Sequence, residues 1–288
     1  MSNALNLGSM NGPSVGIILK EVVRRAMVAI RNERSVFEVR SKEGHSGEMD
    51  DVFTSADRKA QDIYQRVLSE CFPSCGIVAE EGNLAVLPRD GCTAYFTVDP
   101  LDGTKAYIRR QSNGVGTMAA LVEQGQVISA YVGDVFPGEI YGYRPGSDKV
   151  HCITNLDVAQ AMEFHRPLQV GVSYVLLRDP PTKYSALARK FVEKYFGNHE
   201  NYGGSIGTWM THLWKRVNAA VIIPPSYETP WDSTPIIGIS RKLGYLFFRP
   251  SSEVDRWEQF EPQVLPAKYR REHEMLVIHE NDRTAVGL

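Results

Sequence analysis

The sequence predicts a fold of mixed class, α+β in its first half and α/β in its second. Strand-like segments separated by tight turns dominate residues 93–143, which is typical of an antiparallel sheet. After about residue 155, helical and strand-like segments alternate, which is typical of an α/β arrangement. We find neither a repeat nor a clear linker in the sequence. We therefore expect one compact fold with two packed halves, residues 13–150 and 151–288.

Length and composition indicate a globular protein of ordinary charge. The chain has 288 residues, 43% of them hydrophobic, which is enough for a sizeable core. The net charge of −2 gives no reason to expect nucleic acid or an anionic membrane as a partner. The apolar runs are far shorter than the ~20 residues that span a bilayer. We set residues 1–12 aside from the fold reasoning.

The cysteines and the N-terminus indicate a cytoplasmic location. No histidine or cysteine at zinc spacing accompanies the cysteines, so we expect reduced core thiols rather than a metal site or a disulfide. The first residues lack the basic-then-apolar layout of a signal peptide. The thiols in question are Cys71, Cys75, Cys92 and Cys152.

Two amphipathic helices are expected before the strands. Apolar residues recur at helical spacing from Pro13 onward. The second helix is expected to begin at Thr54, which forms a capping box with Asp57, and to end at Pro73. The polar, glycine-containing residues 41–50 between the two helices are expected to form a loop or a lid.

The remaining elements are predicted from apolar runs bounded by glycine and proline. In the first half we expect strands at residues 76–79, 93–98, 115–122, 127–133 and 139–143. In the second half we expect strands at residues 168–174, 219–223, 244–248 and 275–279. Helices are expected near residues 183–196 and 204–216 and from Trp231 onward.

Acidic side chains stand at the ends of several predicted elements. If a layered fold brings these ends to one sheet edge, the carboxylates repel one another unless cations lie among them. Ligands that are all oxygen favour Mg²⁺ or Mn²⁺ over zinc. Backbone N–H groups at the helix start near Gly103 suit a phosphate. The acids are Asp57, Glu80, Glu81, Asp99, Asp102 and Asp232.

Each acidic segment also has a purely structural interpretation. Asp57 suits the first turn of a helix, and Asp232 suits a helix N-cap. Glu80 and Glu81 suit a solvated pair. The turn that begins at Asp99 is a credible β-turn. The metal hypothesis therefore depends on several segments meeting in space.

Taken together, these segments resemble the inositol monophosphatase superfamily, whose members are Mg²⁺-dependent, lithium-sensitive phosphatases. The stretch Asp99-Pro100-Leu101-Asp102-Gly103-Thr104 matches its D-P-[IL]-D-G-T signature. Residues 53–57 are similar to its V-T-x-x-D, residues 78–81 to its G-E-E segment with Ala79 for Gly, and Trp231-Asp232 to its late W-D. Gly204-Ser205 stands where the family has a G-S helix start. Order and spacing agree over roughly residues 14–250.

The resemblance implies a layered αβαβα fold and a set of roles. Glu80, Asp99 and the Leu101 carbonyl would hold one metal ion, and Asp99, Asp102 and Asp232 a second. A third, weaker ion would use Glu80, so two or three Mg²⁺ are implied, with Mn²⁺ as an alternative. Thr104, hydrogen-bonded to Asp57, would orient the attacking water together with Glu80. Phosphate and substrate contacts are assigned to Asp102, Gly103, Thr104, Lys105 and Ser205.

The sequence departs from inositol monophosphatases proper beside these motifs. Those enzymes carry a Glu seven residues before the W-D aspartate, where this chain has Pro225, and Glu228 is displaced by three residues. Lys105 after D-G-T resembles the 3′-phosphoadenosine 5′-phosphate phosphatases. Arg109 and Arg110 either bind a second phosphate or form a solvated basic helix end.

The expected function is a metal-dependent phosphomonoesterase that hydrolyses a small phosphorylated metabolite of the inositol phosphate class with metal-activated water. A 3′-phosphoadenosine 5′-phosphate and a sugar phosphate are the alternative substrates. A non-catalytic member that binds a phosphometabolite is the competing hypothesis, which loss of metal ligands would mark. All matched ligands are present. The resemblance implies a homodimer, and no nucleic acid or membrane partner is expected.

Overall fold

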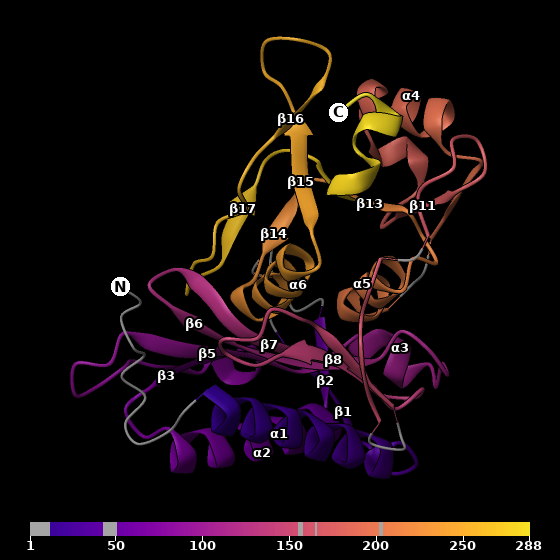
Figure 1. The fold of residues 1–288 in the computed structure, drawn as a ribbon. Coiled ribbons are helices and arrows are strands. Elements are labelled where there is room, and N and C mark those ends of the chain that lie inside the picture. The colour runs from indigo at the N-terminus through magenta and orange to yellow at the C-terminus, as the bar shows by residue number, and fades with distance from the viewer. Residues whose placement is uncertain (1–11, 43–50, 155–157, 165, 202–203) are drawn as a thin grey trace.

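The computed structural model of this chain describes residues 12–42, 51–154, 158–164, 166–201 and 204–288. Its elements form alternating layers, in which helices cover the outer face of each of two sheets and fill the space between them (Figure 1). This is the αβαβα arrangement, and the expected fold class is confirmed.

The first layer is a pair of helices, α1 (Gly12–Glu33) and α2 (Ser55–Cys71). Their apolar side chains, such as the fully buried Leu19, recur on one face of each helix, as the periodicity predicts. Thr54 and Asp57 form the expected capping box at the start of α2. The two helices cover one face of the first sheet (Figure 1).

The first sheet has eight strands in the order β10-β9-β8-β7-β6-β5-β3-β4, and only β3 and β5 pair in parallel. The antiparallel run expected after residue 93 is therefore present. The sheet continues past residue 150, the expected boundary between the halves. Its strands are β3 (Gly76–Ala79), β4 (Ala85–Val86), β5 (Ala94–Asp102), β6 (Gly116–Glu123), β7 (Gln126–Asp134), β8 (Glu139–Tyr143), β9 (His151–Ile153) and β10 (Ala159–Ala161).

The second sheet has six strands in the order β12-β11-β13-β18-β15-β16. β11 pairs in parallel with β12 and β13, and the other pairs are antiparallel. Its strands are β11 (Tyr174–Leu177), β12 (Asn198–Glu200), β13 (Ala220–Ile223), β15 (Tyr245–Pro250), β16 (Trp257–Gln259) and β18 (Met275–His279).

The prediction of a strand at residues 168–174 is wrong, because the chain turns within that stretch before β11 begins. The N–H groups of Val172 and Ser173 both donate to the Gln169 carbonyl. Gly171 has φ 74°, in the left-handed region that glycine adopts readily. A short apolar run by itself does not distinguish an extended strand from such a turn.

Two further corrections concern the loops. Ser41 and Lys42 belong to β1 (Val39–Lys42), which pairs with β2 (Asp51–Thr54), so the expected loop at residues 41–50 is shorter at its start. Residues 43–50 lie outside the described part of the chain. The helix expected from residue 183 begins at Ala186, because Pro181–Lys183 forms a 3₁₀ turn and Ser185 caps the helix.

The helices between and beyond the sheets complete the layers. α5 and α6 lie between the two sheets, and α4 covers the far face of the second (Figure 1). A short α3 follows β5. These helices are α3 (Thr104–Ile108), α4 (Ala186–Tyr195), α5 (Ile206–Trp214) and α6 (Pro230–Lys242). The smaller elements are β1 (Val39–Lys42), β2 (Asp51–Thr54), β14 (Ser226–Glu228), β17 (Tyr269–Arg271), and 3₁₀ turns at Glu81–Asn83, Glu280–Asp282 and Thr284–Val286.

The core follows from the alternation of side chains along the strands. On β6, Ala119 and Leu121 pack toward α1 and α2, whereas Met118 and Ala120 pack toward α5 and α6. β6, in the middle of the sheet, is therefore buried on both faces, and its run from Met118 to Val122 is continuously apolar for that reason.

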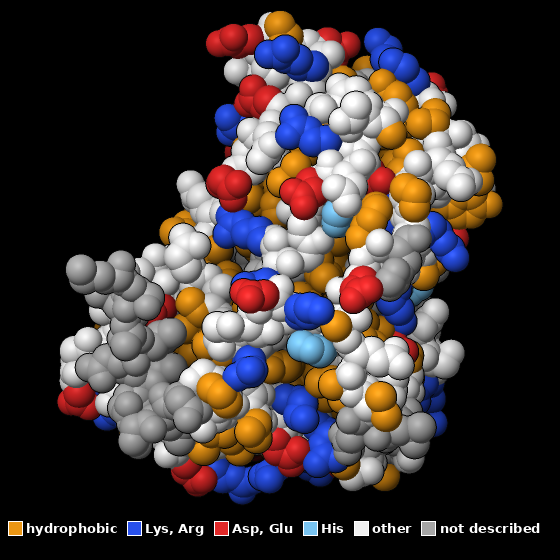
Figure 2. All heavy atoms as spheres, viewed as in Figure 1, with side chains coloured by type: hydrophobic (Ala, Val, Ile, Leu, Met, Phe, Trp, Pro, Cys, Tyr) orange, Lys and Arg blue, Asp and Glu red, His pale blue; other side chains and the backbone are white. Residues whose placement is uncertain are grey.

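The surface is of mixed charge. Acidic and basic side chains are interspersed over the face drawn in Figure 2, in keeping with the net charge of −2. In the described residues, each helix is too short or too polar to cross a membrane. All four cysteines carry free thiols, and the Sγ atoms of Cys75 and Cys92 lie 3.6 Å apart.

A buried carboxyl at the end of β7 carries a prediction about pH. Asp134 is buried, and its Oδ1 has no hydrogen-bond partner among the described residues. Burial raises the pKa of Asp134 to about 6, and the nearby Lys215 opposes the rise. Because the unfolded pKa is about 4, the fold disfavours the charged form, and stability is lost as pH rises from about 4 through about 6.

We therefore expect Asp134→Asn to raise the free energy of unfolding by ~2 kcal/mol at pH 8 and to change it little at pH 4. Urea unfolding at the two pH values measures the difference. The exposed Asp148→Asn serves as the control and should have little effect at either pH. Equal destabilisation of Asp134→Asn at both pH values would contradict the prediction.

Candidate active site

A bulge in β5 brings Asp99 and Asp102 to the same side of the sheet. Asp99 lies opposite Met118 of β6, and Asp102 lies opposite Gly116. Three steps along β5 therefore match two along β6, which is a β-bulge. In a regular strand, side chains three residues apart point to opposite faces. The extra residue removes that difference and turns both carboxylates toward the helices between the sheets.

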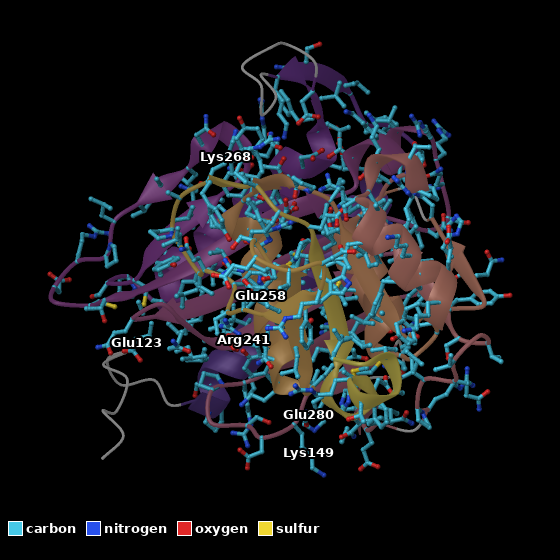
Figure 3. All side chains as sticks on the ribbon, turned by 90° about the horizontal axis from the view of Figure 1, so that it is seen from above. Glu123, Lys149, Arg241, Glu258, Lys268 and Glu280 are labelled. Atoms are coloured by element: carbon cyan, nitrogen blue, oxygen red, sulfur yellow. The ribbon has the colours of Figure 1, made fainter. Side chains whose placement is uncertain are left out.

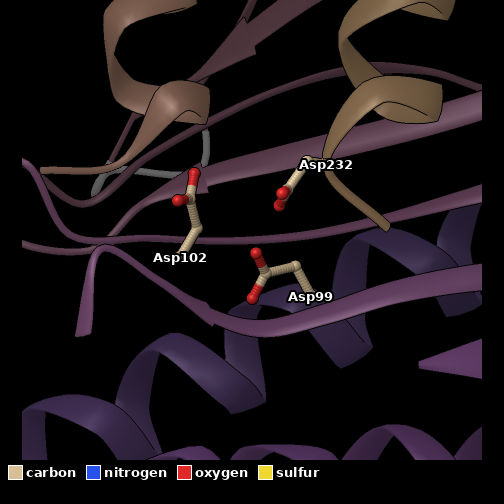
Figure 4. Close-up of side chains that lie close together, drawn as sticks. All are labelled: Asp99, Asp102 and Asp232. Carbon is tan, nitrogen blue, oxygen red and sulfur yellow. The ribbon is translucent and has the colours of Figure 1, made fainter. Parts of the chain in front are cut away.

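The first turn of α6 adds a third carboxylate from 130 residues further along the chain. Asp99, Asp102 and Asp232 each place a ligand atom within 4.8 Å of the other two, and Figure 4 shows the three carboxylates pointing toward one another. Pro230 opens α6, a position that suits proline because its missing N–H is not needed there. The Thr229 hydroxyl donates a hydrogen bond to Asp232. We call these three residues the acidic triad.

Burial and mutual repulsion make the acidic triad suited to a cation. Asp99 is 2% exposed, and its Oδ1 has no hydrogen-bond partner in the described chain. Burial, followed by the charges of Glu80, Asp232 and Asp102, raises the pKa of Asp99 well above its ordinary value. A divalent cation would relieve both the repulsion and the unsatisfied oxygen, and carboxylate oxygens are the ligands that Mg²⁺ prefers.

Ser205 and the start of α5 hold Asp102 in place. Ser205 is fully buried, and its hydroxyl both donates to Asp102 and accepts from the Thr208 N–H at the helix N-terminus. The Gly207 N–H donates to Asp102 Oδ2 at 2.7 Å. Burial raises the pKa of Asp102 to about 7, and these hydrogen bonds oppose the rise. Ser205 is thus directed at Asp102, and its burial separates it from solvent.

Gly103 lets the chain turn tightly from β5 into α3. Its φ is 89°, and a Cβ at this position would lie 2.2 Å from the Gly114 carbonyl oxygen and 2.8 Å from the Ser205 nitrogen. Only glycine fits both the angle and the space. The first turn of α3 begins with N–H groups of Gly103 and Thr104, ahead of the hydrogen bonds that Ala106 and Tyr107 donate to the Gly103 carbonyl.

Asp57 and Thr104 are joined by the hydrogen bond that the family resemblance implies. The Thr104 hydroxyl lies 3.0 Å from Asp57 Oδ1 and 3.3 Å from the Leu101 carbonyl oxygen. Asp57 Oδ2 accepts from the N–H and the hydroxyl of Thr54 at 2.7 and 2.6 Å. Burial raises the pKa of Asp57 to about 6 despite these donors.

Glu80 lies beside the acidic triad and outside it. Its Oε1 accepts from Lys42 Nζ at 2.7 Å, and the same ammonium lies 2.6 Å from Glu81 Oε1. Burial, with the charges of Asp232 and Glu81, raises the pKa of Glu80 to about 8, whereas Lys42 lowers it. The sequence does not predict a role for Lys42, because the polar residues around it are typical of a loop. Pairing of β1 with β2 is what brings it here.

Two cavities adjoin these acidic groups. The Glu80 cavity, about 570 Å³, is lined by Glu80, Lys42 and Trp231 among others. The Trp209 cavity, about 340 Å³, is lined by Asp102, Asp232 and Trp209 among others. A basic side chain that also lines the Glu80 cavity, Lys268, comes from the segment before β17 and lies near the N-terminal elements in the view from above (Figure 3).

The other basic candidates do not line these cavities, although Lys105 reaches Asp51 at the edge of the Glu80 cavity. The Lys105 side chain is 64% exposed, and its Nζ is 3.9 Å from Asp51. Arg109 and Arg110 are exposed at the end of α3. Glu228, the carboxylate nearest in sequence to Pro225, accepts from Arg271 Nε at 2.8 Å. This ion pair links β14 to β17.

Removing the Ser205 hydroxyl is expected to impair both the helix and the site. We expect Ser205→Ala to lower the free energy of unfolding by about 1–2 kcal/mol, through the lost cap and the lost bond to Asp102. Activity should fall by about 10–100-fold, because a carboxylate of the acidic triad loses its support. Chemical denaturation and steady-state kinetics measure the two effects.

Ser185→Ala is a matched control for Ser205→Ala. Ser185 caps α4 by accepting from the Ala188 N–H, and its hydroxyl donates to the buried Glu274 at 2.7 Å. Ser185→Ala thus also removes a helix cap and a hydrogen bond to a buried carboxylate, but on the far side of the second sheet. Similar destabilisation with unchanged activity is expected, and a comparable loss of activity in both variants would contradict a specific role for Ser205.

The comparisons with known proteins agree with this geometry. The sequence profile described as the inositol monophosphatase family matches residues 14–281. A histidinol-phosphatase from Chlorobaculum parvum is 25% identical over 208 residues, which cover 71% of this chain and 75% of that protein. A 3'(2'),5'-bisphosphate nucleotidase CysQ from Salmonella typhimurium is 37% identical over 84 residues, 29% of this chain and 33% of that protein.

Solved structures show the same fold. An IMPase/NADP phosphatase, complexed with NADP and Ca²⁺, has a TM-score of 0.73 at 15% identity, over 96% of this chain and 95% of that one. The extragenic suppressor protein suhB from Bartonella henselae has a TM-score of 0.69 at 18% identity, over 94% and 95% of the two chains. At these identities the likeness concerns the fold alone.

Proposed function

This chain belongs to the inositol monophosphatase family and is a phosphatase, and from that premise we propose that it hydrolyses a small phosphate monoester by Mg²⁺-dependent attack of water. The observation that carries the proposal is the acidic triad, with its carboxylates within 4.8 Å of one another and the unpartnered Asp99 Oδ1. The family is metal-dependent. For this chain we propose two or three Mg²⁺, with Mn²⁺ as a substitute.

The acidic triad would hold the ions, and Glu80 with the Leu101 carbonyl would complete the ligand set. Divalent cations bound there would lower the pKa of a coordinated water and offset negative charge on the ester oxygens. That contribution is large, because uncatalysed hydrolysis of phosphate monoesters is among the slowest reactions known.

The remaining site residues would bind and orient. Thr104, fixed by Asp57, has its hydroxyl beside the Leu101 carbonyl and would position the attacking water together with Glu80. The N–H groups of Gly103 and Thr104 would donate to phosphate oxygens as charge develops on them. We assign Ser205 a positioning role through Asp102, since it is fully buried, and Lys105 at most a long-range electrostatic one.

The proposal is tested by measuring phosphate release from inositol 1-phosphate, glycerol phosphates and 3′-phosphoadenosine 5′-phosphate. Release is expected with about 5–10 mM Mg²⁺, a concentration chosen to fill weak Mg²⁺ sites. Excess EDTA is expected to abolish it. Recovery after Mg²⁺ is restored separates metal removal from damage to the protein. Binding without turnover of any of these esters would favour the non-catalytic alternative.

A bisphosphate nucleotide is the second candidate substrate, and two arginines favour it. Arg178 and Arg270 line the Trp209 cavity, and their ion pairs with Asp179 and Glu272 are long, at 3.9 and 3.5 Å, and exposed. Such pairs are weak, so both guanidinium groups are available to a second phosphate. A much lower KM for 3′-phosphoadenosine 5′-phosphate than for its 5′-monophosphate product would support this candidate.

We also propose a cytoplasmic homodimer.

A further inference from the structure

We propose that this phosphatase selects esters whose alcohol carries a planar ring with a hydrogen-bond acceptor, and that Trp209 determines this selectivity. The inference rests on the proposed hydrolytic function and names the class of leaving group. Asp102 and Asp232 of the acidic triad line the Trp209 cavity. An ester held at the acidic triad can therefore place its alcohol portion in this cavity.

The apolar part of the Trp209 cavity lining suits a ring better than a polyol. Trp209, Tyr227 and Tyr269 contribute aromatic side chains. Aromatic and aliphatic walls gain most from a flat apolar face, whereas hydroxyl groups buried against them lose their hydrogen bonds to water. The buried aliphatic residues of the lining are Ile223, Ile236, Ile237 and Met275.

The acidic groups that line the cavity are already engaged. Asp102 and Asp232 belong to the acidic triad. Glu228 Oε1 accepts from Arg271 Nε at 2.8 Å, in a pair whose side chains are only 13% and 4% exposed. The described lining therefore leaves few carboxylate oxygens to accept from the many hydroxyl groups of a polyol, since Glu228 Oε1 is occupied by Arg271 and Ser226.

Trp209 supplies a donor with no partner of its own. Its side chain is 7% exposed, and its Nε1 has no acceptor among the described residues. A buried donor left without an acceptor is unfavourable, so a ligand that brings an acceptor gains the hydrogen bond without breaking another. The indole N–H donates only, which means that the matching ligand atom is a ring nitrogen or oxygen with a lone pair.

The position of Trp209 on α5 brings it to the same cavity as the acidic triad. The backbone N–H of Trp209 donates to the Ser205 carbonyl at 3.2 Å, so Trp209 lies one helical turn after the serine that holds Asp102. Trp209, Asp102 and Asp232 all line the Trp209 cavity.

The test uses esters of primary alcohols, so that their intrinsic reactivities are alike. The probes are glycerol 3-phosphate, 2-phenylethyl phosphate and the three isomers of 2-(pyridyl)ethyl phosphate. We expect kcat/KM for 2-phenylethyl phosphate to exceed that for glycerol 3-phosphate by about tenfold or more. At least one pyridyl isomer should exceed the phenyl ester by about a further tenfold.

Substitutions at Trp209 separate the ring from its N–H. Trp209→Phe should abolish the preference for pyridyl over phenyl and keep that for phenyl over glycerol, mainly through KM. Trp209→Ala should lose both preferences. Trp214→Phe removes an indole N–H from the same helix, one that donates to Ser240 at 3.0 Å outside the cavity, and should leave both ratios unchanged. Thermal melting of each variant checks folding.

Two results would overturn the inference: equal or better use of glycerol 3-phosphate by the unaltered protein, or an intact pyridyl preference in Trp209→Phe. Absence of turnover with every ester would instead count against the proposed function. In that case calorimetry with the corresponding non-hydrolysable phosphonates and Mg²⁺ measures the same ratios as affinities. A missing ring preference there overturns the inference by itself.

Discussion

Asp99→Asn is expected to abolish phosphate release and, at the same time, to make the metal-free protein more stable near neutral pH. Asp99 is the central member of the acidic triad, and its orphaned oxygen suits a metal ligand. Losing a ligand charge costs several kcal/mol of transition-state stabilisation, which corresponds to about 10³-fold in kcat/KM. The same change removes a buried carboxylate that three other acids repel.

The opposite signs of the two effects make the experiment decisive. Phosphate release is measured with saturating Mg²⁺, and the unfolding midpoint is measured in EDTA at pH 7.5. Asp148→Asn, at an exposed position, is the matched control and should change neither quantity. An inactive and destabilised Asp99→Asn would indicate a structural role, and near-normal turnover would refute the ligand role.

The second large effect is that Mg²⁺ should stabilise the protein more as the pH rises. The pKa values of Asp57, Asp102 and Glu80 are raised to about 6, 7 and 8, chiefly by burial. Each lies above its unfolded value of about 4, so the folded protein binds more protons than the unfolded chain between those limits. Stability of the metal-free protein is therefore lost as pH rises from about 4 to about 8.

Bound at the ionised carboxylates as proposed, Mg²⁺ would reverse this loss. We expect Mg²⁺ to raise the free energy of unfolding only slightly at pH 5 and by several kcal/mol at pH 8, on the order of 1.4 kcal/mol for each unit by which a pKa is raised. The unfolding midpoint should rise accordingly. Differential scanning fluorimetry in EDTA and in Mg²⁺ across this range measures it. A pH-independent difference, or stabilisation that Asp99→Asn retains in full, would rule out the acidic triad as the binding site.

The helix starts in this chain are encoded locally and could be predicted. Thr54 and Asp57 form a capping box from residues three apart, and the structure has that box at the start of α2. The apolar periodicity of α1 is equally local. Where local signals conflicted, prediction failed: the apolar residues near Leu168 indicated a strand, but the turn at Gly171 delays β11 to Tyr174.

The candidate site was predictable in its residues and only partly in its arrangement. Asp99, Asp102 and Asp232 were identified from their motifs, and the structure brings them together. The motifs also group Glu80 with them, and in the structure Glu80 pairs with Lys42. That pairing requires β1 to lie against β2, a contact for which a polar loop sequence gives no signal.

The sequence by itself thus determined which atoms are available at this site: three carboxylates, a threonine hydroxyl, and a glycine where no other residue fits. Only the tertiary structure decided how they meet. The β5 bulge depends on pairing with β6, and the bond from Ser205 to Asp102 joins residues 103 positions apart. Local patterns reflect neighbours within a few residues. Such contacts, like the Trp209 cavity, arise only when distant segments pack.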